Sequence, residues 1–137
     1  MHMVKSSIKV VPFTESMYEE VAKWYTSHGW EMAPVLEMLP DVGFVAVDEA
    51  GNKHAVGFLY STNSNMYLLE WTATNPASGL KTRAKALKSI VKRVQQLTKL
   101  EKPLARVIQL TPNESIIRTY ERLGFKKTEQ GTMLLWS

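Results

Sequence analysis

The sequence of 137 residues contains no cysteine and only three histidines, at His2, His28 and His54. The lack of cysteine excludes disulfides, thiolate nucleophiles and cysteine-ligated metal sites, and it fits a reducing compartment. The three histidines do not have the spacing of metal ligands. No apolar run approaches the roughly 20 residues of a membrane span, and the N-terminus lacks the apolar stretch of a signal peptide. We therefore expect a soluble, cytoplasmic protein.

Internal repeats, low-complexity tracts and Gly/Ser-rich linkers are also absent. The chain is close to the commonest domain length, so residues 1–137 are expected to form one domain with one hydrophobic core. With 45% hydrophobic and 22% charged residues, the composition is that of a globular protein.

The formal net charge of +4 is unevenly distributed along the chain. Six basic residues fall within one short stretch: Lys81, Arg83, Lys85, Lys88, Lys92 and Arg93. Such a cluster usually forms a solvated helix face. It can also attract a ligand that carries phosphates, or a nucleic acid backbone. Charge alone does not choose among these interpretations.

The start of the chain favours a strand followed by a helix. The β-branched residues within 8–13 predict the strand. Ser16 and Glu19 have the spacing of a capping box, and Gly29 suits a left-handed C-cap. A helix is therefore expected over residues 16–28.

A second short helix and an antiparallel meander are expected next. Pro34 suits the first turn of a helix within residues 30–39. Strands with turn residues between them are predicted at 42–47, 55–60 and 66–72.

The second half of the chain alternates helices and strands. Apolar residues recur at helical spacing from Leu80: Leu80, Ala84, Leu87, Val91 and Val94. A buried strand is expected at 105–110, a helix opens at Asn113, and a last strand covers 132–136. An antiparallel meander followed by such alternation predicts an α/β fold with a mixed sheet and flanking helices.

The helix that opens at Asn113 has clear end signals. Asn113 can act as its N-cap, and Gly124 can take the left-handed C′ position. Phe125 would then pack back on Tyr120. Capping and packing explain this segment without any function.

The same segment, NESIIRTYERLGF, resembles one of the most recognisable stretches of the GNAT superfamily of acyl-CoA-dependent N-acetyltransferases. The matching residues are Asn113, Tyr120, Leu123, Gly124 and Phe125. The resemblance in element order extends from Ile8 to Trp136. It implies a GNAT-like fold, acetyl-CoA as co-substrate, a small-molecule or peptide amine as acceptor, and direct attack without a covalent enzyme intermediate. Dimers are common in the family, so a homodimer is compatible with it.

The resemblance also implies roles for individual residues. Asn113 would contact the pantetheine arm or the acceptor side of the cleft. Tyr120 would act as general acid on the leaving thiolate, since a phenol pKa of about 10 lies close enough to that of a thiol for proton donation. Thr72 and Thr74, on the strand that faces the cofactor in the family, would contact acetyl-CoA.

In the family, backbone amides at the start of the long helix bind the CoA pyrophosphate through the motif Gln/Arg-x-x-Gly-x-Gly/Ala. The equivalent stretch here is Gly79, Leu80, Lys81, Thr82, Arg83 and Ala84, or a register shifted by two residues. The first register keeps Leu87 on the helix face. In neither register is the first glycine of the motif present, so the phosphate loop is degenerate.

Glu70 lies where some GNAT enzymes place a general base that takes a proton from the acceptor ammonium. An outward-facing strand glutamate is the alternative explanation. For the whole protein, the alternative is a catalytically inactive GNAT-like binding module that binds nucleic acid through the basic helix. Transfer of another acyl group is equally compatible with the sequence.

Overall fold

The computed structural model describes residues 7–110, 114–127 and 133–136, with only the backbone described for 114–116 and 133–136. The strands are β1 (Lys9–Pro12), β2 (Val42–Val47), β3 (Lys53–Ser61), β4 (Met66–Thr74), β5 (Arg106–Leu110), β6 (Lys126–Lys127) and β7 (Met133–Trp136). The helices are α1 (Tyr18–Ser27), α2 (Leu80–Glu101) and α3 (Glu114–Arg122), with short 3-10 turns η1 (Glu15–Met17) and η2 (Leu36–Met38). No helix in this part of the chain is long and apolar enough to cross a membrane.

The strands that the structure describes form one sheet in the order β1-β2-β3-β4-β5-β7-β6. Neighbouring strands are antiparallel except β4 and β5, which run parallel. The meander β2-β3-β4 and the mixed sheet predicted from the sequence are confirmed. The lysine pair of β6 gives no strand signal, and this strand was not predicted.

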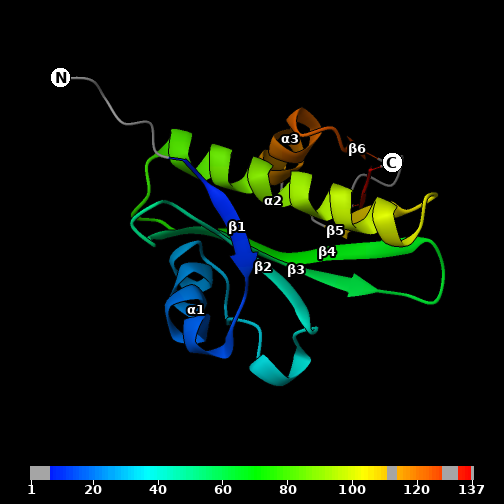
Figure 1. Ribbon diagram of the computed structural model, residues 1–137. Helices are drawn as coiled ribbons and strands as arrows, with labels where there is room; N and C mark the ends of the chain where they lie inside the picture. Colours follow the sequence, from blue (N-terminus) through cyan, green and yellow to red (C-terminus); the bar gives the residue numbers. More distant parts are fainter. Residues whose placement is uncertain (1–6, 111–113, 128–132, 137) are drawn as a thin grey trace.

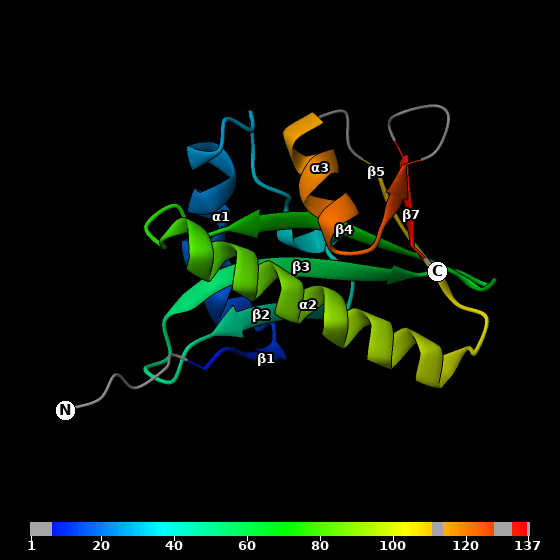
Figure 2. The same cartoon turned by 90° about the horizontal axis from the view of Figure 1, so that it is seen from above.

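The helices cover both faces of the sheet, as Figures 1 and 2 show. Helices α2 and α3 lie on one face, over a core that contains Leu69, Ile90 and Tyr120. Helix α1 lies on the other face, where Trp24 packs in a cluster with Phe58. The sheet therefore separates two apolar clusters, and β4 contributes side chains to both.

Helix α2 follows the apolar periodicity of the sequence. Leu87, Val91 and Val94 are buried against the sheet, whereas the basic residues of this helix are mostly exposed. The first turn departs from this pattern, because Leu80 is 79% exposed although it lies on the same apolar face. The start of α2 thus projects an apolar side chain that the sheet does not cover.

Two glycines end helices in the way that the sequence predicts. Gly29 (φ 89°) and Gly124 (φ 104°) both take the left-handed C′ position. In each case the next amide donates back to the helix: Trp30 N to Tyr25 O at 3.1 Å, and Phe125 N to Tyr120 O at 3.0 Å. These are Schellman motifs, and they bring an aromatic ring onto the last turn of each helix.

Two expectations for the first half were wrong. The first helix begins with the 3-10 turn η1 and has Met17 at the N-cap without a side-chain hydrogen bond, so Ser16 does not form a capping box. The second helix is reduced to η2, because the residue before Pro34 is disfavoured in helix and Val35 is extended. Hydrogen bonds from tyrosine hydroxyls hold this segment instead. Tyr18 donates to the carbonyl of Pro34, and Tyr60 donates to the carbonyl of Met38.

The substitution Gly29→Ala tests the cap of α1. A Cβ at this position meets nothing within 4 Å, so the cost arises from the left-handed backbone alone. We expect the free energy of unfolding to fall by about 1 kcal/mol. Gly79→Ala is the matched control, because its site is equally open but its φ is −66°. Equal denaturation midpoints for the two variants would contradict the assignment.

Candidate active site

Strand β4 contains a β-bulge near its middle. In the pairing with β3, Phe58 opposes Glu70 and Val56 opposes Ala73, so Trp71 and Thr72 together face the single residue Gly57. Trp71 has φ 54°, in the left-handed region that non-glycine residues rarely occupy. The bulge shifts the alternation of side chains by one position for the remainder of the strand.

Aromatic contacts stabilise this unusual backbone. The Tyr25 hydroxyl donates a hydrogen bond to the carbonyl of Trp71. The Trp71 ring lies 5.3 Å from that of Trp30 and 6.0 Å from that of Tyr25. On the opposite strand, a Cβ at Gly57 would lie 3.2 Å from the Thr72 methyl group, so glycine leaves room for Thr72. Helix α1 and its C-cap thus fix the bulge.

The pairing of β4 with β5 ends just before the bulge. The last paired residues are Leu68 and Ile108. Two residues further along, the carboxylate of Glu70 accepts a hydrogen bond from the backbone amide of Leu110, with Oε2 at 3.0 Å from N. A side chain has therefore replaced the ladder bond that a continuing pair of parallel strands would make.

Glu70 is partly buried where the two strands separate. Burial raises the pKa of its carboxyl from 4.5 to about 7, and the hydrogen bond from Leu110 offsets part of that effect. A carboxyl with a pKa near neutrality can accept a proton and release it again under physiological conditions. The Glu70 side chain is thus partly buried and hydrogen-bonded to the neighbouring strand.

Tyr120 and Thr72 lie together on the other side of β4. The buried Tyr120 hydroxyl is 2.7 Å from the Thr72 hydroxyl oxygen, and the Gln109 amide nitrogen is 2.9 Å from the same oxygen. Burial raises the pKa of Tyr120 to about 12, while the hydrogen bond with Thr72 acts in the opposite direction. The phenol is therefore protonated at neutral pH.

The proton of the Thr72 hydroxyl is not used in its hydrogen bonds with Tyr120 and Gln109. Its oxygen accepts from both Tyr120 and Gln109, so its own proton must be donated to a third group. Thr72 lines the cleft described below. The Gln109 carbonyl oxygen is buried and has no hydrogen-bond partner among the described residues. The Thr72 proton is therefore available to a molecule in the cleft, whereas Gln109 is not among the lining residues.

A cleft of about 550 Å³ opens between α2 and α3 at this point. Its floor is the end of β4 from Thr72 to Thr74, and Tyr120 lies on its α3 side. The remaining lining residues are His28, Trp30, Leu80, Arg83, Ala84, Leu87, Thr119, Arg122 and Leu123. The exposed first turn of α2 therefore forms one wall of this cleft.

The start of α2 is uncapped by any side chain, since its N-cap is Gly79. The first backbone bond of the helix runs from Arg83 N to Gly79 O at 2.9 Å, so the amides of residues 80–82 have no acceptor within the helix. The Arg83 guanidinium lies over the preceding loop, at 2.9 Å from the Ser78 carbonyl and 2.6 Å from that of Pro76. Backbone donors and positive charge thus meet at one helix end.

The residues predicted from the sequence are only partly brought together. Thr72, Thr74, Leu80, Arg83, Ala84 and Tyr120 line the cleft. Gly79, Lys81 and Thr82 lie at the start of α2, but they are not among the residues that line the cleft. Glu70 lies where β4 and β5 separate, and Asn113 falls outside the described residues.

Several site residues were not predicted. Gln109 had a usable signal, because it is the one amide side chain within the otherwise apolar run 107–110. Arg122 and His28 had none, because exposed charged and polar residues near helix ends are common. Trp30 reaches the cleft through the C-cap of α1, where its amide donates to the Tyr25 carbonyl.

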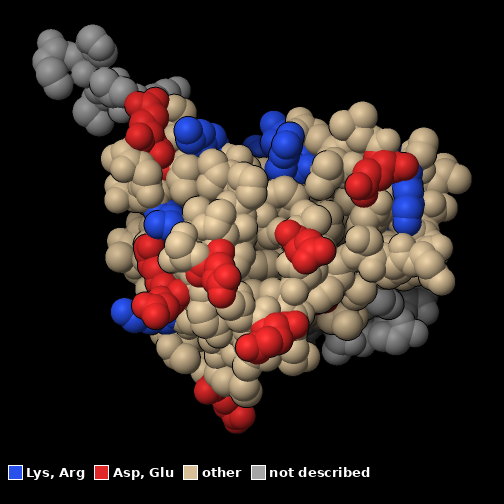
Figure 3. All heavy atoms as spheres, turned by 60° about the horizontal axis from the view of Figure 1, so that its bottom comes forward, with Lys and Arg blue, Asp and Glu red and all other residues tan. Residues whose placement is uncertain are grey.

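Charge differs between the two faces of the molecule. Between residues 15 and 41 the chain carries Glu15, Glu19, Glu20, Glu31, Glu37 and Asp41 against the single base Lys23. Figure 3, which brings the α1 face forward, shows acidic side chains over that face and basic ones mainly toward its margins. The basic cluster predicted from the sequence lies on α2, across the sheet.

No known protein-family model matches the sequence, and no curated protein matches it. Solved structures do match its fold. An acetyltransferase of the GNAT family from Staphylococcus aureus Mu50 superimposes with a TM-score of 0.73 at 14% identity, over 95% of this chain and 98% of the other. A mutant of spermidine N-acetyltransferase from Vibrio cholerae gives 0.71 at 11% identity, over 93% and 94%. AAC(6')-Ib in complex with paromomycin and acetyl-CoA gives 0.65 at 17% identity, over 96% and 93%. The GNAT fold expected from the segment at 113–125 is confirmed.

The raised pKa of Glu70 predicts how the stability of the ligand-free protein depends on pH. Between pH 4.5 and about 7 the folded protein retains a proton that the unfolded chain releases. The stability that this carboxyl contributes below pH 4.5 is therefore lost as the pH rises through 7. We expect Glu70→Gln to gain stability relative to the wild type between pH 5 and pH 8, as measured by urea denaturation. The exposed Glu37→Gln is the matched control, and a pH-independent difference for Glu70→Gln would contradict the buried environment.

Proposed function

We propose that this protein is an N-acetyltransferase that moves an acetyl group from acetyl-CoA to an amine by direct attack. The observation that carries the proposal is the meeting of Glu70, Thr72 and Tyr120 where β4 and β5 separate. A base with a pKa near 7 and a protonated phenol lie on the two sides of one strand. The shared fold makes acyl transfer the expected chemistry for this arrangement, although the fold alone does not decide it.

Acetyl-CoA would lie in the cleft between α2 and α3. Its pyrophosphate would accept hydrogen bonds from the free amides at residues 80–82, at the positive end of the helix dipole. Arg83 and Arg122 line the same cleft and add positive charge. The glycine that the family motif has at Thr82 is missing, so this site relies on amides and charge more than on close backbone approach. The exposed Leu80 would cover apolar parts of the ligand.

The acceptor amine would approach from the acidic face that carries α1. An ammonium group must lose a proton before its nitrogen can attack, and Glu70 is the base placed to take it. Its raised pKa makes it a better proton acceptor than an ordinary glutamate. The negative charge of residues 15–41 would favour cationic acceptors over anionic ones.

Thr72 and Tyr120 would act on the thioester. The nitrogen–carbon bond forms as the carbon–sulfur bond breaks, the thioester oxygen carries negative charge in between, and the sulfur leaves with the bonding electrons. The spare Thr72 proton would stabilise that oxygen, and Tyr120 would supply the proton that the sulfur needs. The second proton that the attacking nitrogen loses as the amide forms would then restore the Tyr120 phenol. Burial raises the proton affinity of the departing thiolate as it does that of the phenol, so the transfer remains feasible.

Binding of the co-substrate is the first test. Calorimetric titration should detect acetyl-CoA binding, and a hundredfold excess of acetyl-CoA over its Kd should stabilise the fold by about 2.7 kcal/mol. Acetyl-pantetheine, which lacks the phosphates, should bind much more weakly if the start of α2 holds them. No binding of acetyl-CoA, together with salt-sensitive binding of nucleic acid, would favour the alternative of an inactive binding module.

Removal of the Tyr120 hydroxyl tests the chemical step. Tyr120→Phe should lower kcat for acetylation of an amine such as spermidine by about a hundredfold or more, with little change in the KM for acetyl-CoA. Tyr67→Phe is the matched control, because this buried hydroxyl bonds to Glu101 at the far end of α2. Full activity in a folded Tyr120→Phe variant would exclude Tyr120 as the acid.

A further inference from the structure

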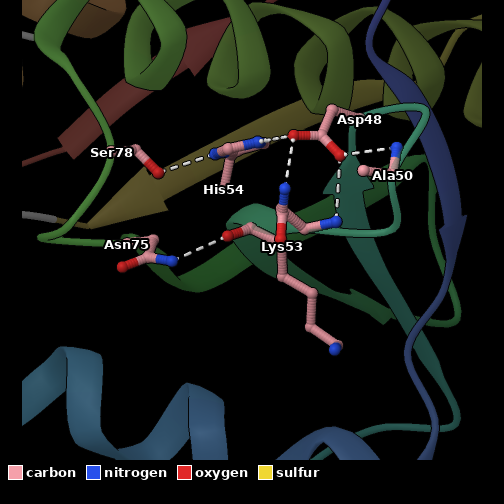
Figure 4. A network of polar contacts seen from close by, with 7 residues as sticks. Asp48, Ala50, Lys53, His54, Asn75 and Ser78 are labelled. Atoms are coloured by element: carbon pink, nitrogen blue, oxygen red, sulfur yellow. Dashed lines mark hydrogen bonds and ion pairs between the residues drawn. The ribbon is translucent and has the colours of Figure 1, made fainter.

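Three side chains outside the cleft form a continuous hydrogen-bonded chain, shown in Figure 4. His54 Nε2 lies 2.8 Å from Asp48 Oδ2, and His54 Nδ1 lies 2.6 Å from the Ser78 hydroxyl oxygen. The side chains of His54 and Asp48 are only 12% and 16% exposed. The chain connects the β2–β3 turn to the loop that precedes α2.

Asp48 is a fixed and ionised end of this chain. The hydrogen bond with His54, followed by bonds from Asn52, lowers the pKa of the Asp48 carboxyl to about 2. Its other oxygen accepts the backbone amides of Ala50 and Asn52 at 3.0 and 2.9 Å. Because a carboxylate only accepts hydrogen bonds, His54 must carry a proton on Nε2. The state of Nδ1 then determines what Ser78 can do.

The loop before α2 has anchors other than the His54 side chain. Asn75 bonds through its side chain to the Lys53 carbonyl at 2.8 Å and through its amide to the His54 carbonyl at 2.9 Å. Arg83 holds the carbonyls of Pro76 and Ser78 from the helix side. The hydrogen bond between the His54 and Ser78 side chains is therefore additional to a loop that is already tied at both ends.

Ser78 immediately precedes Gly79, the N-cap of α2, and lies two to four positions before residues 80–82 along the chain. When His54 is neutral, its Nδ1 accepts the Ser78 proton, and the serine presents only lone pairs to its surroundings. When His54 is protonated, Nδ1 donates to the Ser78 oxygen, and the hydroxyl proton is released for another acceptor. The protonated form alone turns Ser78 into a donor that matches an anion.

We infer that Asp48, His54 and Ser78 form a proton-coupled arm of the phosphate-binding site, in which His54 gains a proton when a phosphate group of CoA accepts the Ser78 hydroxyl. His54 is a positioning residue that acts through Ser78. The inference rests on the proposed function, since it places the CoA phosphates at the start of α2.

The charges around His54 agree with this coupling. Asp48 places its negative charge 2.8 Å from Nε2. Arg83 faces the loop from α2, and Lys53 precedes His54 on β3, where its ammonium pairs with Glu20 of α1 at 3.1 Å. A phosphate that accepts the Ser78 hydroxyl would add a second negative charge, on the Nδ1 side of the ring. Affinity should therefore rise as the pH falls within the range of about 5 to 8 in which histidines usually titrate.

Proton uptake on binding tests the inference directly. The ligand is 3′-dephospho-CoA, which keeps the pyrophosphate but lacks the phosphomonoester that itself titrates near pH 6. Calorimetric titrations in two buffers of different ionisation enthalpy give the number of protons taken up. We expect the wild type to take up protons at pH 7 and to bind about fivefold more tightly at pH 6 than at pH 8, the size of one hydrogen bond gained.

Two variants separate the coupling from loop structure. Ser78→Ala removes the hydroxyl, and His54→Asn keeps a donor near the Nδ1 position that does not titrate. Both should lose the extra proton uptake and the pH dependence, with melting temperatures close to that of the wild type. Ser89→Ala, which removes a hydroxyl bonded to a carbonyl further along α2, is the matched control. Glu70 is unchanged in all four proteins, so only differences between them are assigned to His54.

The outcomes are distinct. If 3′-dephospho-CoA and acetyl-CoA bind to the wild type at no pH, the proposed function is wrong and the inference falls with it. If they bind but proton uptake and pH dependence are the same in wild type, Ser78→Ala and His54→Asn, the inference alone is wrong. Loss of the coupling in both variants and its retention in Ser89→Ala would support it.

Discussion

The backbone of β4 turns through a left-handed residue at Trp71, and the positions of the candidate catalytic side chains follow from that turn. In an unbroken strand Trp71 and Ala73 would share a face with Leu69. The bulge instead places Thr72 on that face, within hydrogen-bond distance of Tyr120, and sends Trp71 to the α1 side. A left-handed tryptophan costs roughly 1–2 kcal/mol. The Tyr25 hydroxyl and the contact between the tilted rings of Trp30 and Trp71 offset that cost.

Burial of ionisable side chains determines the protonation states in the candidate site. Glu70 and Tyr120 both have raised pKa values, and in both cases burial is the largest cause. Their effects differ because the groups differ: the carboxyl becomes a usable base near neutral pH, whereas the phenol stays a donor. The ionised Asp48 shows the reverse, since hydrogen bonds from His54 and Asn52 lower its pKa to about 2. Hydrogen bonding thus keeps Asp48 ionised, whereas burial disfavours the ionised forms of Glu70 and Tyr120.

Local patterns in the sequence predicted most of the fold. The periodicity of α2, the glycine caps at Gly29 and Gly124 and the antiparallel meander are each encoded by neighbouring residues, and the structure confirms them. The failures arose where distant residues decide the outcome. The segment 30–39 is held by tyrosine hydroxyls from α1 and β3 rather than by its own helical bonds.

The site was predicted only in part for the same reason. Tyr120, Thr72 and Glu70 were named from a resemblance, but a strand with period two gives no sign of a bulge that moves Thr72 to the Tyr120 side. The pairing of His54 with Ser78, 24 positions later, depends on the β3 strand and the α2 loop meeting in space. Such contacts are properties of the folded chain, and short sequence motifs do not predict them.

We propose that the separation of β4 and β5 creates the site of acetyl transfer. A crystal structure of the protein with CoA tests it most directly. We predict that the pantetheine arm lies along β4 beyond the bulge, with the sulfur within hydrogen-bond distance of the Tyr120 hydroxyl and the pyrophosphate on the amides of residues 80–82. CoA bound elsewhere on the molecule, or with its sulfur remote from Tyr120 and Thr72, would contradict the account.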